Sequence, residues 1–227
     1  MPICFLCGDD GADTTEHVVP RCLYPGALPN DVITLPAHEL CNKFTSKDEE
    51  AFRNHVAVAI QPASAALPLW EKTWRALHRS EGAGMQRKFY SDMLSVPMLD
   101  CDGTVRPSPV IAQLEYERAD RVLAKIVKGL FLWKTGALLP NDVTWSFGQA
   151  ENGRDQVRLP NEGRFMVHDV LDVRWGHVAE APCATTWILG FHGVLWFWVL
   201  TVPTGLPTPA EHEKGEVMLW PGPGSTR

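Results

Sequence analysis

Two short cysteine and histidine patterns constrain the fold of this 227-residue chain more than any other feature. The first is Cys4-x-x-Cys7 followed by Gly8, and the second is His38-x-x-Cys41 with the same two-residue gap. A turn after the first pair lets two thiolates face one ion, and an imidazole with a third thiolate completes a tetrahedral set. We therefore predict a structural Zn²⁺ site formed by these four side chains.

Other interpretations of the cysteines remain open. A redox-active Cys-x-x-Cys would lead directly into a helix, whereas residues 8–11, Gly-Asp-Asp-Gly, are typical of a turn. Cys22 is an alternative zinc ligand, although its apolar neighbours Leu23 and Tyr24 favour a buried thiol. The N-terminus has neither the basic start nor the apolar run of a secretory signal. We therefore expect the protein to reside in the cytoplasm, where thiols stay reduced.

The composition predicts a globular protein without a large positive field. Hydrophobic residues make up 45% of the chain, enough to fill a core, and the net charge is −6. Residues 71–134 hold 11 Lys/Arg against 8 Asp/Glu, whereas residues 1–70 hold 4 against 9. The middle segment is therefore the expected contact for a polyanion, with a solvated helical face as the alternative.

Between the two patterns we expect a β-hairpin. Residues 14–20 alternate like a short strand that Pro20 closes, and residues 31–35 form a second β-like run. Glu16 and His17 would project to opposite sides of an ideal strand. They reach a common site only if the strand is bulged or ends there.

A helix is expected after the second pattern. Apolar residues recur at helical spacing in this segment: Leu40, Phe44, Phe52 and Val56. Ser46 and Glu49 match a capping box, so the helix is either continuous or restarts at Ser46. Asn42 lies at the start of this helical segment, where it is able to face the hairpin.

The order of these motifs resembles the HNH endonucleases. Cys-x-x-Cys is followed by Glu-His-Val-x-Pro, then by Cys-Asn and Ser-Lys-Asp-Glu-Glu-x-Phe-Arg, so that the resemblance covers about residues 4–54. Residues 122–130 are more loosely similar to a helix found downstream in some members. The resemblance implies a ββα-metal fold with one catalytic divalent ion, often beside a separate structural zinc.

The resemblance also implies roles for individual residues. His17 is the expected general base, since a neutral imidazole takes a proton from water near pH 7. Glu16 and Asn42 are the expected ligands of the catalytic ion, Mg²⁺ or another divalent transition metal. Asn30 is the candidate for the asparagine that orients the histidine, with Thr34 or a backbone carbonyl as alternatives.

Charged residues of the first helix have two interpretations. Three basic residues are candidates for nucleic-acid binding or for a solvated helix face: Lys43, Lys47 and Arg53. The acidic residues 48–50 suit the start of a helix, and one of them is an alternative metal ligand.

The remaining chain predicts further helices and a sheet. We expect helices over residues 69–80 and 115–135, the latter ended by Gly136. Five basic residues are expected on the outer surface of the second: Arg118, Arg121, Lys125, Lys128 and Lys134. The tryptophans of residues 69–80 are expected in the core, with stacking on unpaired bases as the alternative. Residues 86–98 fit a strand or a short helix.

The last third of the chain is β-like. Strands are expected over residues 164–173, 187–191 and 194–202, with a tight turn at His192-Gly193 and an irregular tail from Pro203. Three tryptophans of this region are expected in the core or at a dimer face: Trp187, Trp196 and Trp198.

The predicted fold class is α+β: an N-terminal zinc-stapled ββα-metal finger followed by helices and an antiparallel β-sheet. Residues 1–60 are the expected HNH-like nuclease module. Residues 61–227 are the expected accessory region, which either packs with the module as one unit or forms a separate unit. The expected function is metal-dependent hydrolysis of nucleic-acid phosphodiester bonds, with DNA as substrate and no membrane partner. The alternatives are a catalytically inactive zinc-binding module for nucleic acid or protein, and a homodimeric interaction protein.

Overall fold

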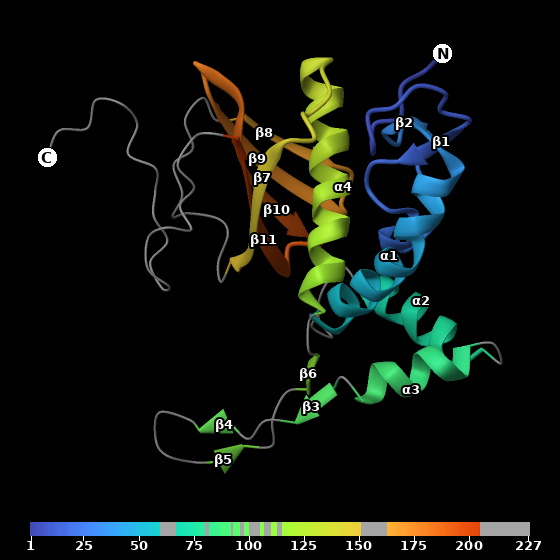
Figure 1. Ribbon diagram of the computed structural model, residues 1–227. Helices are drawn as coiled ribbons and strands as arrows, with labels where there is room; N and C mark the ends of the chain where they lie inside the picture. Colours follow the sequence, from blue (N-terminus) through green and yellow to red (C-terminus); the bar gives the residue numbers. More distant parts are fainter. Residues whose placement is uncertain are drawn as a thin grey trace, which may run out of the picture.

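The computed structural model describes residues 1–59, 67–79, 82–91, 115–150 and 163–204, and four short strands between residues 93 and 112 (Figure 1). The expected hairpin is present: β1 (Thr14–His17) pairs antiparallel with β2 (Thr34–Ala37). The 3-10 helix η1 (Arg21–Leu23) lies in the connection, and α1 (Glu39–Ala59) follows the hairpin.

The expected helix of residues 115–135 is confirmed as α4 (Tyr116–Thr135). It ends at Gly136, whose φ of 71° lets its N–H bond the Leu132 carbonyl. Two shorter helices precede it, α2 (Leu67–Leu77) and α3 (Ala83–Ser91). The short strands form two pairs: β3 (Met93–Ser95) with β6 (Val110–Ala112), and β4 (Met98–Leu99) with β5 (Val105–Arg106). No helix of the described residues is long and apolar enough to cross a membrane.

The C-terminal third forms a five-stranded antiparallel sheet in the order β7-β11-β10-β9-β8. Its strands are β7 (Val143–Ala150), β8 (Gly163–Val167), β9 (Leu171–Val178), β10 (Ala181–Phe191) and β11 (Leu195–Pro203). The predicted hairpin turn at His192-Gly193 is confirmed, with φ of 51° and 70°. The prediction of one strand over residues 164–173 is wrong, because a turn with φ of 51° at His168 divides it. The tail beyond residue 204 lies outside the described residues.

One hydrophobic core joins the N-terminal and C-terminal parts of the chain. Its buried residues come from the end of the hairpin, from α1, from α4 and from one face of the sheet, including Val18, Phe52, Ile126 and Trp187. Figure 1 shows α4 between the sheet and the hairpin with α1. At Gly129 the helix comes close to Val18, the residue directly after β1, so that a Cβ there would lie 2.7 Å from the Val18 methyl groups. This contact brings α4 against the hairpin.

Helix α1 differs from its prediction in two respects. It runs through Ser46 without a break, since the Ser46 hydroxyl donates to the Lys43 carbonyl within the helix. Phe52 is buried as expected, but Leu40 is 80% exposed and Phe44 is 73% exposed. The helical spacing of apolar residues therefore included two residues, Leu40 and Phe44, that lie outside the buried face of α1.

The opposite face of the sheet carries its own apolar cluster. Ile188 and Trp196 are buried there, with Trp198 packed against them, while Trp187 lies in the main core. The Trp196 indole covers the backbone of Gly190. The expected burial of these tryptophans is therefore divided between two faces.

Replacing Gly190 by alanine is expected to destabilise the protein by about 1–3 kcal/mol, because overpacking forces neighbours to shift. The new Cβ would lie 2.3 Å from the Trp196 ring. Gly26→Ala is the control, since no heavy atom lies within 4 Å of that position. Urea unfolding measures both variants, and equal stabilities would contradict the packing described.

Candidate metal centre and buried ionic cluster

The first cysteine pair lies in a tight knuckle. The Gly8 N–H donates to the Cys4 carbonyl at 2.8 Å, and Gly8 has a φ of 86°, which favours glycine. The Phe5 N–H donates to the Pro36 carbonyl at 3.0 Å, which fastens the knuckle to β2. The chain therefore brings both cysteines to the end of the hairpin.

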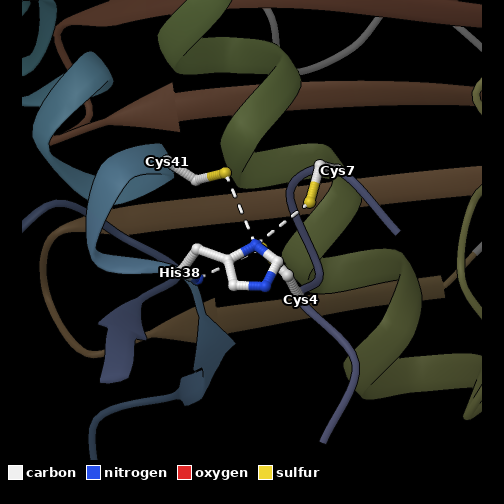
Figure 2. A group of neighbouring side chains, drawn as sticks. All are labelled: Cys4, Cys7, His38 and Cys41. Atoms are coloured by element: carbon white, nitrogen blue, oxygen red, sulfur yellow. Dashed lines mark hydrogen bonds between the residues drawn. The ribbon is translucent and has the colours of Figure 1, made fainter. Parts of the chain in front are cut away.

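The second pair lies where β2 meets α1, and it faces the knuckle (Figure 2). The ligand atoms of Cys4, Cys7, His38 and Cys41 all lie within 4.8 Å of one another. His38 Nδ1 is 3.3 Å from Cys7 Sγ and 3.9 Å from Cys41 Sγ. Tetrahedral Zn²⁺ with ordinary bond lengths separates its ligand atoms by roughly 3.5–3.8 Å. The group fits a structural metal such as zinc, as predicted.

Hydrogen bonds around the group set the histidine tautomer. His38 Nε2 lies 3.1 Å from the Asp10 carbonyl oxygen. Because a carbonyl only accepts, Nε2 carries the proton and the lone pair of Nδ1 faces the thiols. The His38 backbone N–H also donates to Cys4 Sγ at 3.4 Å, which favours a thiolate.

The thiols of the group have very different pKa values. Burial raises the pKa of Cys4, but backbone N–H groups, including that of His38, outweigh this effect and lower it to about 7. Burial and the neighbouring charges of Cys4 and Cys7 raise the pKa of Cys41 to about 12. Three thiolates at this separation repel one another unless a cation neutralises them, so the donor set suits a dication.

Helix α4 and the segment after it support the knuckle. Lys128 Nζ donates to the Leu6 carbonyl at 2.8 Å, and Asn141 Nδ2 donates to the Cys7 carbonyl at 2.8 Å. Leu132 packs against the buried residues of the knuckle. The sequence contained no local motif for these contacts, because the partners lie far apart along the chain.

A second group of charged residues lies under the hairpin. Lys125 of α4 is 2% exposed, and its Nζ donates to Glu16 Oε1 at 2.5 Å and also to Glu49. Glu16 is 6% exposed. The Thr45 hydroxyl lies 3.2 Å from Glu49 Oε1 and 3.1 Å from the carbonyl oxygen of Asn42. We call Glu16, Glu49 and Lys125 the ionic cluster.

The acids of the cluster differ from exposed carboxylates. Burial raises the pKa of Glu49, although the Lys125 ammonium opposes this shift. We call Cys4, Cys7, His38 and Cys41 the zinc group. Cys22 is not part of it, and its half-buried thiol donates to the Glu49 carbonyl at 3.4 Å. Cys22 is therefore a partly buried thiol packed against the main core, where the sequence favoured a buried one.

The structure places His17 at the last position of β1, opposite Thr34 of β2. The pairing is regular and without a bulge, so His17 and Glu16 project to opposite sides of the strand, which ends at His17. Its imidazole makes no hydrogen bond or ion pair with any described residue. Asn30 is exposed in the loop before β2 and makes no hydrogen bond to His17. Thr34 shares the strand face of His17.

Asn42 lies in the first turn of α1, on the helix face of Thr45 and Glu49. The structure thus joins Glu16 of the hairpin to the Asn42 face of α1 through Lys125 and Glu49. Of the three acidic residues 48–50, Glu49 is the one that faces Glu16, a role the sequence left undecided.

The three candidate phosphate-binding residues of α1 differ in their exposure to solvent. Lys43 and Lys47 are exposed, and Lys43 also pairs with Glu39 at 2.8 Å. Arg53 was expected beside them, but it is 6% exposed and donates to Asn54 Oδ1 at 2.7 Å. Its buried position removes it from the exposed face of α1.

The expectation that the basic residues of α4 lie on its outer surface is wrong for Lys125. Arg121 also points toward α1, where Nε donates to Asp48 Oδ2 at 2.7 Å. Their spacing with Lys128 corresponds to one face of a helix, a pattern that could have indicated the inward orientation. Lys125 and Arg121 of the basic middle segment are therefore paired with acids of the N-terminal part of the chain.

The zinc group thus joins the N-terminal knuckle to the start of α1, and the ionic cluster joins β1 to α1. Helix α4 contacts the knuckle through Lys128 and supplies Lys125 to the ionic cluster. Comparisons of the chain with models of protein families, with curated proteins and with solved structures found no match.

Proposed function

We propose that this protein is a metal-dependent endonuclease that hydrolyses phosphodiester bonds of nucleic acid, with DNA as the expected substrate. In this proposal the hairpin and α1 form a ββα-metal finger. One observation carries the proposal: Lys125 donates to both Glu16 and Glu49. Glu16 precedes His17 at the end of β1, and Glu49 lies on the α1 face that also bears Asn42.

His17 is the proposed general base. Its partly exposed imidazole removes a proton from water as the water oxygen attacks phosphorus. The bond from phosphorus to the 3′ oxygen then breaks, and the leaving oxygen takes a proton from a solvent water, which gives a 5′-phosphate and a 3′-hydroxyl. Thr34, opposite His17 on β2, is the proposed positioning residue for the imidazole, in place of Asn30.

Glu16 and Asn42 are the proposed ligands of a catalytic divalent ion. Their carboxylate and amide oxygens are the hard donors that Mg²⁺ and Mn²⁺ prefer. The ionic cluster has two carboxylates and one ammonium, a formal charge of 1 − 2 = −1, so it suits a further cation. Such an ion, when bound, stabilises negative charge on the phosphate and on the leaving oxygen.

The exposed Lys43 and Lys47 of α1 are the proposed phosphate contacts. Because the first seventy residues are acidic overall, these contacts are few. Because the salt dependence scales with the number of phosphate contacts, we therefore expect binding to weaken only modestly as salt increases.

The direct test incubates the zinc-loaded chain with supercoiled plasmid, single-stranded DNA or RNA, each with Mg²⁺, Mn²⁺ or Ni²⁺. We expect nicking of DNA that depends on the added ion and leaves 5′-phosphate ends. Absence of cleavage for every substrate and ion would overturn the proposal.

One observation favours the alternative of a catalytically inactive zinc-binding module. Lys125 bonds Glu16 Oε1, and a carboxylate used only for this ion pair would be structural. The alternative predicts nucleic-acid or protein binding without any cleavage product. Cleavage that depends on His17 would eliminate it.

A further inference from the structure

Lys125 is buried to an extent that packing alone does not require. It is 2% exposed and lies on α4 among apolar core residues such as Val122 and Ile126. Removing a charged side chain from water is costly, and apolar residues of similar volume often stabilise a core better than a buried ion pair does. A buried lysine that contacts two acids therefore points to a role beyond stability.

The contacts of Lys125 indicate what this role is. Its ammonium is shared by carboxylates of two separate elements, Glu16 of β1 and Glu49 of α1. The bond to Glu16 Oε1 restricts rotation of that carboxylate. The positive charge also lies where it repels any cation that approaches Glu16.

The charged residues near Lys125 make other contacts and do not take its place beside Glu16. Asp48 faces α4 but is held by Arg121 and by Arg118, at 2.7 and 3.6 Å. Lys128, one turn further along α4, donates to the knuckle instead. Among the described residues, Lys125 is the ammonium that bonds Glu16.

We propose that Lys125 is a positioning residue for Glu16 and that its charge holds down the affinity of this site for divalent cations. The inference rests on the proposed function for the identity of the ion, but its test does not need catalysis. Loss of the charge leaves two carboxylates without a counterion. The site then binds a dication more tightly while Glu16 is less well oriented.

Three variants separate charge from packing. Lys125→Met removes the ammonium but keeps an unbranched side chain, whereas Lys125→Arg keeps the positive charge. Lys72→Met is the matched control: Lys72 is a half-buried lysine whose Nζ donates at 2.5 Å to a neutral group, the Tyr24 carbonyl.

The test measures Mn²⁺ binding to the zinc-loaded full-length chain by electron paramagnetic resonance. We expect Lys125→Met to bind Mn²⁺ at least about tenfold more tightly than the unmodified chain, from the loss of a nearby like charge. Lys125→Arg and Lys72→Met should stay within about threefold of it. An Mn²⁺ affinity of Lys125→Met equal to that of Lys72→Met, or no Mn²⁺ binding by any of these proteins, would overturn the inference.

Zinc content and thermal unfolding show whether each variant is folded. If Lys125→Met does not fold, Glu49→Gln decides, because it removes a negative charge and should weaken Mn²⁺ binding about tenfold. Unchanged Mn²⁺ binding by Glu49→Gln would then overturn the inference.

Cleavage assays on the same proteins keep the two proposals distinct. We expect Lys125→Met to cleave at least about tenfold more slowly at saturating Mn²⁺, with partial recovery in Lys125→Arg. The expected ordering of Mn²⁺ affinities without cleavage by any protein would overturn the proposed function and leave the inference standing. Cleavage by the unmodified chain, together with equal Mn²⁺ affinities of Lys125→Met and Lys72→Met, would overturn the inference and leave the proposed function standing.

Discussion

Replacing Cys41 by serine is expected to give a protein without stoichiometric zinc and with a thermal midpoint lower by about 10 °C or more. The apolar core of the knuckle is small, with Cys4, Phe5 and Ala37 as its buried residues. We therefore expect a bound ion to supply most of the stability of this end of the hairpin. Metal analysis and thermal unfolding of the purified variant measure both effects.

Cys22→Ser is the matched control for this prediction. Its thiol is half-buried and contacts the Glu49 carbonyl, away from the zinc group. A hydroxyl can make the same contact, so this variant should keep one zinc per chain. Full zinc content in Cys41→Ser, or loss of zinc in Cys22→Ser, would show that the ligand set is different.

Replacing His17 by alanine is expected to slow cleavage by about 10²- to 10⁴-fold, the usual contribution of a general base. The zinc content and the free energy of unfolding should change little, because the His17 imidazole makes no hydrogen bond or ion pair within the described part of the chain. Single-turnover nicking of plasmid measures the cleavage rate.

His78→Ala is the control for His17→Ala. His78 is an exposed histidine directly after α2, and its ring contacts Trp74 of that helix. This variant should cleave at the rate of the unmodified chain. A rate for His17→Ala within tenfold of that control would contradict the assignment of the base.

The elements that were predictable from sequence are those set by local chemistry. The paired spacing of Cys4, Cys7, His38 and Cys41 predicted the metal group, because a tetrahedral ion needs two close pairs. The α4 periodicity and Gly136 predicted a helix and its end. The His192-Gly193 pair predicted the turn between β10 and β11.

The errors arose where distant parts of the chain meet. Lys125 looked like a surface residue because its two partners lie on β1 and α1, far from it in sequence. Arg53 looked exposed for the same reason, since burial of α1 against the rest of the core is a tertiary effect. Helical spacing alone also made Leu40 and Phe44 look buried, although the packed face of α1 begins beyond them.

The candidate catalytic residues show the same limit. The resemblance implied roles for Glu16, His17 and Asn42, but it could not say which acid of α1 faces Glu16. Tertiary packing of α4 on the hairpin selects Glu49. The register of β1 against β2 places Thr34, rather than Asn30, opposite His17.

We propose that one metal ion holds the fold while a second takes part in chemistry. The most direct test titrates Mn²⁺ into the zinc-loaded chain, while plasmid nicking and zinc content are measured on the same samples. We expect no nicking with zinc alone, nicking that rises with Mn²⁺, and a constant one zinc per chain. Nicking that is complete without added Mn²⁺, or that appears only as zinc is displaced, would contradict the account.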